Sequence, residues 1–258
     1  MSNFKDIAIQ AARQAGDYTL EFLDKDVVYS MKTAHDIQAE ADVGSEQIII
    51  KTIKSAFPDH SIFAEESGHE DQRSDYLWII DPIDGTINFS RHIEEYCVSI
   101  ALSHKDKIIL AVLYAPAMQQ LIIAEAGKGA YLNDRKITVS SENKLINCLV
   151  ATDNSSNIEG RKRNLAALGV FAPEVRHVRV LGSAAWCMGR IAQGQIDLYY
   201  KYAFNYYDYA AGILIVQEAG GTVTDMDGHP ITINSQNIVA TNGAMHQETL
   251  DFIKSCQT

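Results

Sequence analysis

Residues 78–89 read WIIDPIDGTINF, and this segment decides how the chain is interpreted. An apolar strand runs into Asp81. Pro82 then fixes its own φ and lacks an N–H, so the strand is expected to stop there. Gly85 allows a tight turn, after which Thr86 can begin a helical turn whose free N–H groups point outward. The segment therefore predicts two carboxylates, Asp81 and Asp84, beside a place where an anion can bind.

Two acids at one strand end repel each other unless a cation lies between them. Their oxygens, together with an inward-turned backbone carbonyl such as that of Ile83, suit Mg²⁺ or Mn²⁺. The alternative is a plain turn in which Asp84 caps a helix and Asp81 is solvated.

Two further acidic segments favour the metal. Glu65, in the segment AEESG at residues 64–68, directly follows the apolar pair Ile62 and Phe63. Asp208, in the segment YYDYAAG at residues 206–212, precedes another apolar run. Asp208 is placed to cap the helix that begins there, or to hold a metal at its start.

The rest of the hydrophobic pattern indicates the fold class. Helical spacing is found at residues 3–24, 38–56, 158–168, 184–193, 208–219 and 243–255. Strand-like runs are found at residues 77–80, 96–102, 107–115, 119–125, 147–151, 176–181, 196–202, 222–225 and 238–241. Helices, then a meander of strands, then alternating helix and strand predict a layered α+β or mixed α/β architecture.

Composition excludes several classes of protein. The 258 residues include 22 Lys+Arg and 33 Asp+Glu, a formal net charge of −11, so binding to nucleic acid is not expected. No apolar run approaches the roughly 18 residues that span a bilayer, so no membrane partner is expected either. The four cysteines are far apart and the first residues do not resemble a signal peptide. We therefore expect a cytoplasmic protein with buried thiols.

Several catalytic motifs are absent. The sequence has no P-loop, no Gly-x-Gly-x-x-Gly and no Gly-x-Ser-x-Gly. The pair His69-Glu70 is not a zinc-protease motif, because Arg73 stands where the second histidine is needed. The eight histidines are scattered, and most are expected to be surface or capping residues.

The three acidic segments together resemble the inositol monophosphatase family, within the lithium-sensitive, metal-dependent sugar phosphatases. The matching residues are DPIDGTIN at 81–88, EES at 65–67 and DYAAG at 208–212, followed by EAGG at 218–221. Lys32, Asp36 and Asp42 resemble the family's early polar loop and helix start. The match extends from there to the end of the chain, in the family's order and spacing.

The resemblance implies a fold and a set of roles. The fold is a layered αβαβα sandwich of the inositol monophosphatase type, forming one catalytic unit over residues 1–258 with halves of about 1–142 and 143–258. Two or three Mg²⁺ ions (Mn²⁺ is an alternative) are implied, held by Glu65, Asp81, the carbonyl of Ile83, Asp84 and Asp208.

Catalytic and substrate-binding roles follow in the same way. A hydroxyl at Thr86, assisted by Glu65, is implied to deprotonate the attacking water, and the amides of Gly85 and Thr86 to hold the phosphate. Asp84 belongs to the catalytic group as well. The segment Gly182-Ser183-Ala184 is implied to contact the alcohol part of the substrate, beside Asp208; read locally, it is a helix start with small residues for packing.

The chain departs from the family pattern at a few positions. Lys201, seven residues before Asp208, stands where inositol-cleaving relatives often have Glu. A lysine there favours a substrate with a second anionic group, such as a phosphate or a carboxylate. The alternative is a local shift of the correspondence or a solvated lysine. Tyr207 replaces the usual Trp, Ala64 the usual Gly, and Ile87 a frequent Thr or small residue.

We therefore expect a Mg²⁺-dependent phosphomonoesterase that acts on a small-molecule phosphate ester, inositol monophosphate first. The alternatives are histidinol phosphate, fructose 1,6-bisphosphate, a 3′-phosphonucleotide or NADP, or a non-catalytic binding or regulatory protein with the same fold. A homodimer and inhibition by Li⁺ are also implied.

Overall fold

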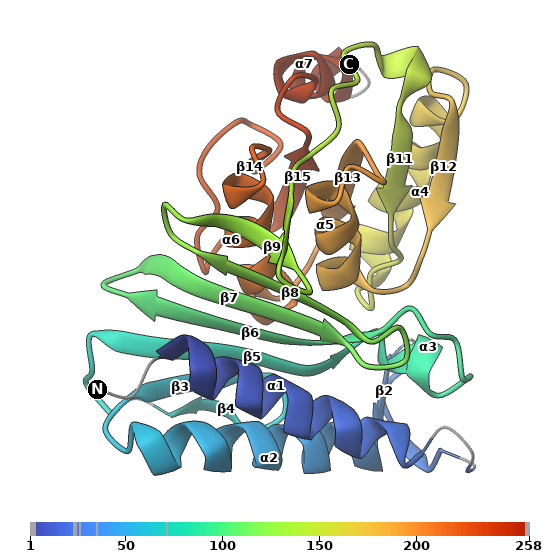
Figure 1. Cartoon of the computed structure of the whole chain (residues 1–258). Helices are drawn as coiled ribbons and strands as arrows, with labels where there is room; N and C mark the ends of the chain where they lie inside the picture. Colours follow the sequence, from blue (N-terminus) through green and yellow to red (C-terminus); the bar gives the residue numbers. More distant parts are fainter. Residues whose placement is uncertain (1–3, 23–24, 26, 35, 71, 256–258) are drawn as a thin grey trace.

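The computed structural model describes residues 4–22, 25, 27–34, 36–70 and 72–255, which form five layers (Figure 1). Helices α1 (Phe4–Leu20) and α2 (Glu40–Ala56) cover one face of an eight-stranded sheet. Helices α5 (Ala184–Ala192) and α6 (Ala210–Glu218) lie between that sheet and a five-stranded one. Helices α4 (Ile158–Phe171) and α7 (His246–Ser255) cover the outer face of the second sheet.

The large sheet has the strand order β10-β9-β8-β7-β6-β5-β3-β4. Its strands are β3 (Ser61–Ala64), β4 (Gly68–Glu70), β5 (Tyr76–Asp84), β6 (Cys97–His104), β7 (Lys107–Ala115), β8 (Gln120–Glu125), β9 (Gly129–Leu132) and β10 (Arg135–Ile137). All neighbours are antiparallel except β3 and β5. That parallel pair places the ends of β3 and β5 side by side.

The small sheet has the order β12-β11-β13-β15-β14. Its strands are β11 (Leu149–Thr152), β12 (His177–Val180), β13 (Leu198–Tyr202), β14 (Thr222–Thr224) and β15 (Asn237–Thr241). A separate hairpin is formed by β1 (Tyr29–Thr33) and β2 (Asp36–Ala39). The short helices are α3 (Thr86–Phe89), η1 (Leu145–Asn147) and η2 (Tyr206–Asp208).

An apolar core lies between each pair of adjacent layers. Four alanines of α1 are fully buried, so this helix lies close to α2 and to the large sheet. On the opposite face of the sheet, Ile122 of β8 and Trp186 of α5 belong to one cluster. Further clusters join α5 and α6 to the small sheet, and the small sheet to α4 and α7. The αβαβα sandwich expected from the sequence is confirmed.

The structure corrects one local prediction. The strand that was expected to stop at Pro82 continues to Asp84. Asp81 pairs with Ser99 and Asp84 pairs with Cys97, so an advance of three residues along β5 corresponds to an advance of two residues along β6. This bulge accommodates Pro82, because a residue without an N–H is tolerated where ladder pairing is interrupted. The helical turn expected after Gly85 is confirmed as α3.

Other sequence expectations have mixed outcomes. Cys97, Cys148 and Cys187 are buried free thiols, and Cys256 lies outside the described residues. The division into halves near residue 142 stays a prediction. No helix in the described part of the chain is long and apolar enough to cross a membrane.

Candidate active site

The end of β5 buries two carboxylates. Asp81 is 2% exposed and Asp84 is 8% exposed, so the alternative with a solvated Asp81 is wrong. The backbone N–H of Ile83 donates to Oδ1 of Asp81 at 3.1 Å. That contact lies within the bulge and fixes the Asp81 side chain at the strand end.

Gly85 lets a distant segment approach Asp84. Its φ is 101°, and a Cβ there would lie 3.0 Å from the carbonyl oxygen of Glu95 and 3.2 Å from that of Gly182. The start of α5 consequently reaches Asp84, which accepts hydrogen bonds from the Ser183 hydroxyl and from the amides of Ala184, at 3.2 Å, and Ala185, at 2.8 Å. Ser183 and Ala184, predicted to bind substrate, therefore also hold Asp84 in place.

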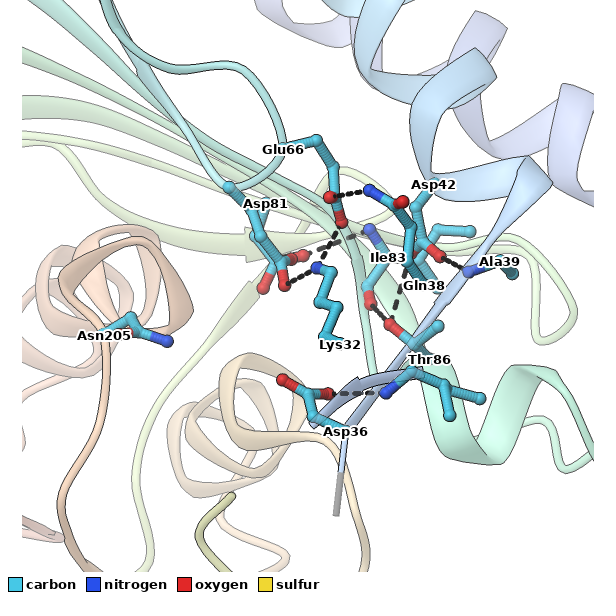
Figure 2. A network of polar contacts seen from close by, with 12 residues as sticks. Lys32, Asp36, Gln38, Ala39, Asp42, Glu66, Asp81, Ile83, Thr86 and Asn205 are labelled. Atoms are coloured by element: carbon cyan, nitrogen blue, oxygen red, sulfur yellow. Dashed lines mark hydrogen bonds and ion pairs between the residues drawn. The ribbon is translucent and has the colours of Figure 1, made fainter. Parts of the chain in front are cut away.

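Glu65 lies beside Asp81 because β3 runs parallel to β5. Its N–H donates to the carbonyl of Ile80 at 3.2 Å. The Lys32 ammonium from β1 lies 2.9 Å from Glu65 Oε1 and 2.5 Å from Glu66 Oε1, and Gln38 donates to the other oxygen of Glu66 (Figure 2). The hairpin β1–β2 thus brings a cation to the acids at the end of β3.

Thr86 has a different partner from the one implied by the family resemblance. Its hydroxyl lies 3.2 Å from Asp42 Oδ1 and 3.0 Å from the carbonyl of Ile83, and no contact with Glu65 is observed among the described residues. The second oxygen of Asp42 accepts the Ala39 N–H at 2.6 Å (Figure 2). Asp42, at the start of α2, is therefore the acid that contacts Thr86 in this structure, and the role of Glu65 stays a prediction.

Residues after β13 complete the site. Asp208, the last residue of η2, accepts the N–H of Asn205 at 3.2 Å and makes no side-chain cap on α6. The capping alternative is therefore wrong. Lys201, on β13, lies over the Tyr209 ring with its ammonium 5.8 Å from the ring centre.

All predicted site residues except Ser183 line one cavity of about 280 Å³. The described residues that line it are Asp36, Glu65, Asp81, Ile83, Asp84, Gly85, Thr86, Ile87, Asn88, Asp153, Asn154, Ser156, Arg161, Val180, Gly182, Ala184, Lys201, Asn205 and Asp208. Ser183 does not line the cavity; it is buried, and its hydroxyl donates a hydrogen bond to Asp84.

Six lining residues were not predicted as site residues from the sequence: Asp153, Asn154, Ser156, Arg161, Val180 and Asn205. Asp153 is buried and accepts the Gly182 N–H at 2.6 Å and the Tyr199 hydroxyl at 3.0 Å. Asp153 could have been found, because it follows the apolar run at 147–151 much as Asp81 follows its strand.

The buried carboxylates of the cavity are destabilised in their charged form. Burial, reinforced by Glu65, Asp84 and Asp208, raises the pKa of Asp81 well above its usual value. Burial also raises the pKa of Asp84 to about 6 and that of Asp208 to about 8, while the Lys201 ammonium opposes both shifts. An uncompensated group of buried acids favours protonation or a bound cation.

The donor set fits a hard divalent cation. The candidate ligands are carboxylate oxygens and the carbonyl of Ile83, with no sulfur or imidazole, as Mg²⁺ and Mn²⁺ prefer. An ionised carboxylate has about four acceptor positions, so the hydrogen bonds to Asp84 and Asp208 leave lone pairs for a metal. Glu65, Asp81, Asp84 and Asp208 could hold such ions, and the other three acids all act on the charge of Asp81.

These acids do not form one tight cluster. Within the described ranges, the one group of three ligand atoms lying within 4.8 Å of one another belongs to Asp225, Asp227 and His229, on an exposed turn. The cavity acids are more widely spaced.

The sequence profile of the inositol monophosphatase family matches residues 1–257. The chain belongs to this family. It is 38% identical to the putative Nus factor SuhB of Neisseria meningitidis serogroup B, over 99% of each protein. It is also 36% identical to a fructose-1,6-bisphosphatase/inositol-1-monophosphatase of Thermotoga maritima, over 84% of this chain and 82% of that protein.

A solved structure supports the same family. An inositol monophosphatase from Anabaena (Nostoc) sp. PCC 7120 superposes with a TM-score of 0.89 at 34% identity, covering 98% of this chain and 95% of the other. Members of this family with different names thus share the fold over nearly the whole length. The family supports a phosphatase activity, while the names of the relatives differ in substrate and role.

Proposed function

We propose that this family member is a Mg²⁺-dependent phosphomonoesterase that hydrolyses a small polyol phosphate, with inositol monophosphate as the reference substrate. The observation that carries the proposal is the convergence of Glu65, Asp81, Asp84 and Asp208 on one cavity that Thr86 also lines. The proposed ligands are these four acids and the carbonyl of Ile83, for two or three Mg²⁺ ions, with Mn²⁺ as a substitute.

The chain's own groups supply positioning and proton transfer. Divalent cations in this site would lower the pKa of water and neutralise the phosphate oxygens and the leaving alkoxide. The Thr86 hydroxyl orients the attacking water for in-line displacement and passes a proton toward Asp42, whose pKa burial raises to about 8. The amides of Gly85 and Thr86, at the start of α3, lie where the first N–H groups of a helix lack internal partners and can bind phosphate.

The other substrates of the superfamily remain alternatives: histidinol phosphate, fructose 1,6-bisphosphate, a 3′-phosphonucleotide and NADP. A non-catalytic binding or regulatory role is also an alternative, and the Nus factor names of some relatives describe those proteins. A cytoplasmic location, a homodimer, inhibition by millimolar Li⁺ and the lack of a nucleic-acid partner remain predictions.

Colorimetric phosphate release from the purified chain tests the proposal. A panel containing inositol 1-phosphate and the alternative substrates is assayed with Mg²⁺, with Mn²⁺ and with excess EDTA. We expect release that requires the metal and is restored when Mg²⁺ exceeds EDTA. A chain that releases no phosphate from any substrate under these conditions is not the proposed enzyme.

A further inference from the structure

We propose that the preferred substrate carries a second anionic group, held by Lys201 and Arg161, which both line the cavity. This inference rests on the proposed phosphatase function and names its substrate class. The two cations come from separate elements, β13 and the first turn of α4, and both line the cavity.

Arg161 has hydrogen-bond donors that have no partner among the described residues. Its Nε donates to the carbonyl of Ser155 at 3.2 Å, which fixes the guanidinium beside the loop that leads into α4. Its two terminal nitrogens make no hydrogen bond or ion pair with the described residues. Lys162 and Arg163, the next two residues of α4, instead pair with Glu159. A fixed guanidinium whose two terminal nitrogens have no partner among the described residues suits a phosphate or a carboxylate.

Lys201 is the second unpaired cation. Across the described residues its ammonium has no carboxylate within 4.0 Å, although its charge acts on Asp84, Asp153 and Asp208. Asp153 is already occupied by the Gly182 N–H and the Tyr199 hydroxyl. If cations occupy Asp84 and Asp208, Lys201 is left facing added positive charge.

A second anion on the substrate would compensate the unpaired positive charges of Lys201 and Arg161. The substrate's scissile phosphate lies against the acids and their cations, and a second anion on its alcohol part compensates Lys201 and Arg161. Asn154 and Ser156, on the loop between β11 and α4, line the same cavity and add polar side chains. The shared chemistry is an anionic group, either a second phosphate or a carboxylate.

Three substrates with the same six-carbon chain test the inference. Glucitol 6-phosphate has a neutral alcohol at C1, 6-phosphogluconate a carboxylate, and glucitol 1,6-bisphosphate a second phosphate. We expect kcat/KM for both anionic substrates to exceed that for glucitol 6-phosphate by about tenfold or more, as a charge-assisted contact provides. A preference for the bisphosphate alone identifies the second anion as a phosphate.

Variants of Lys201 and Arg161 test whether these residues cause the preference for anionic substrates. Lys201→Gln and Arg161→Gln should each reduce the ratio of anionic to neutral kcat/KM by about fivefold or more, mainly through KM, and Lys201→Arg should retain it. The matched control is Lys162→Gln, which removes the same charge from an exposed neighbour of Arg161 and should leave the ratio unchanged. A wild-type ratio near one, or a ratio that neither variant changes, overturns the inference.

Binding separates this inference from the proposed function. If neither these three compounds nor the phosphate-release panel that contains inositol 1-phosphate yields phosphate, the proposed function fails by itself. Calorimetric binding of 6-phosphogluconate and glucitol 6-phosphate, with and without Mg²⁺, still tests the second anion. Tighter binding of the carboxylate that is lost in Lys201→Gln and Arg161→Gln supports the inference, and equal binding of the two compounds contradicts it.

Discussion

Two sets of residues that line the cavity differ in charge and in how closely they follow the family. The acidic end comprises Glu65, Asp81, Asp84 and Asp208, and every one of these positions matches the family motif. The second set comprises Asn154, Ser156, Arg161 and Lys201, and Lys201 departs from the family pattern. Under the proposed function, the acidic end carries out the reaction and the second set selects the substrate.

Asp84→Asn should have the largest effect, because it removes a charged, proposed metal ligand from the acidic end. We expect kcat/KM to fall by at least about 100-fold, while hydrogen bonds from Ser183 and Ala185 to the amide oxygen keep the fold. Steady-state kinetics and circular dichroism measure the two properties. The control is Asp227→Asn, which removes one carboxylate from the exposed turn. Near-normal turnover in Asp84→Asn removes that residue from the reaction.

Asp153→Asn tests whether burial alone makes a carboxylate catalytic. Asp153 is as buried as Asp81, but it holds Gly182 and Tyr199 and is not assigned a metal. We expect a loss of about tenfold, as for groups that position others. The Mg²⁺ concentration at half activity should stay unchanged, whereas it should rise in Asp84→Asn. A shifted Mg²⁺ requirement in Asp153→Asn would extend the acidic end to include Asp153.

Lys32→Gln should have the smallest effect, because it removes one cation from the acidic end. Lys32 bridges two largely buried acids, whose side chains are 15% and 7% exposed, so its loss leaves Glu65 and Glu66 uncompensated. We expect the metal-free Tm to fall by about 2–4 °C, as a loss of about 1 kcal/mol does in a protein of this size. Mg²⁺ should restore most of the difference, which differential scanning fluorimetry measures.

Lys105→Gln is the matched control for Lys32. Lys105 pairs with Asp75 where both side chains are more than 60% exposed, and such a pair contributes little to stability. Its Tm should match wild type with and without Mg²⁺. If Lys32→Gln behaves like Lys105→Gln, then Lys32 does not balance the charge of the acidic end.

The sequence predicted the layers and the acidic end because both depend on local patterns. The 3.6-residue spacing located α2 within two residues, and the residues of the acidic end follow or precede apolar runs. The strands β9 and β10 were missed, because they are short and β10 carries the exposed charges Arg135 and Lys136. The bulge at Pro82 was missed because it depends on pairing with β6.

Of the second set, Lys201 was predicted from the sequence, whereas Arg161 was beyond prediction for a physical reason. Arg161 reaches the cavity only because α4 packs on the small sheet, and neighbouring residues Lys162 and Arg163 have the same character in sequence. The contact between Thr86 and Asp42 was not predicted for a similar reason. Asp42 is 44 residues away in sequence, and the approach of α2 to the end of β5 brings the two together.

Anomalous diffraction from crystals soaked with Mn²⁺ and phosphate tests the central claim most directly. We expect at least two Mn²⁺ peaks within coordination distance of Glu65, Asp81, Asp84 and Asp208, with Asp81 contacting both, and phosphate beside Thr86. Peaks only at the exposed turn of Asp225, Asp227 and His229, with none in the cavity, would contradict a metal-dependent phosphatase site.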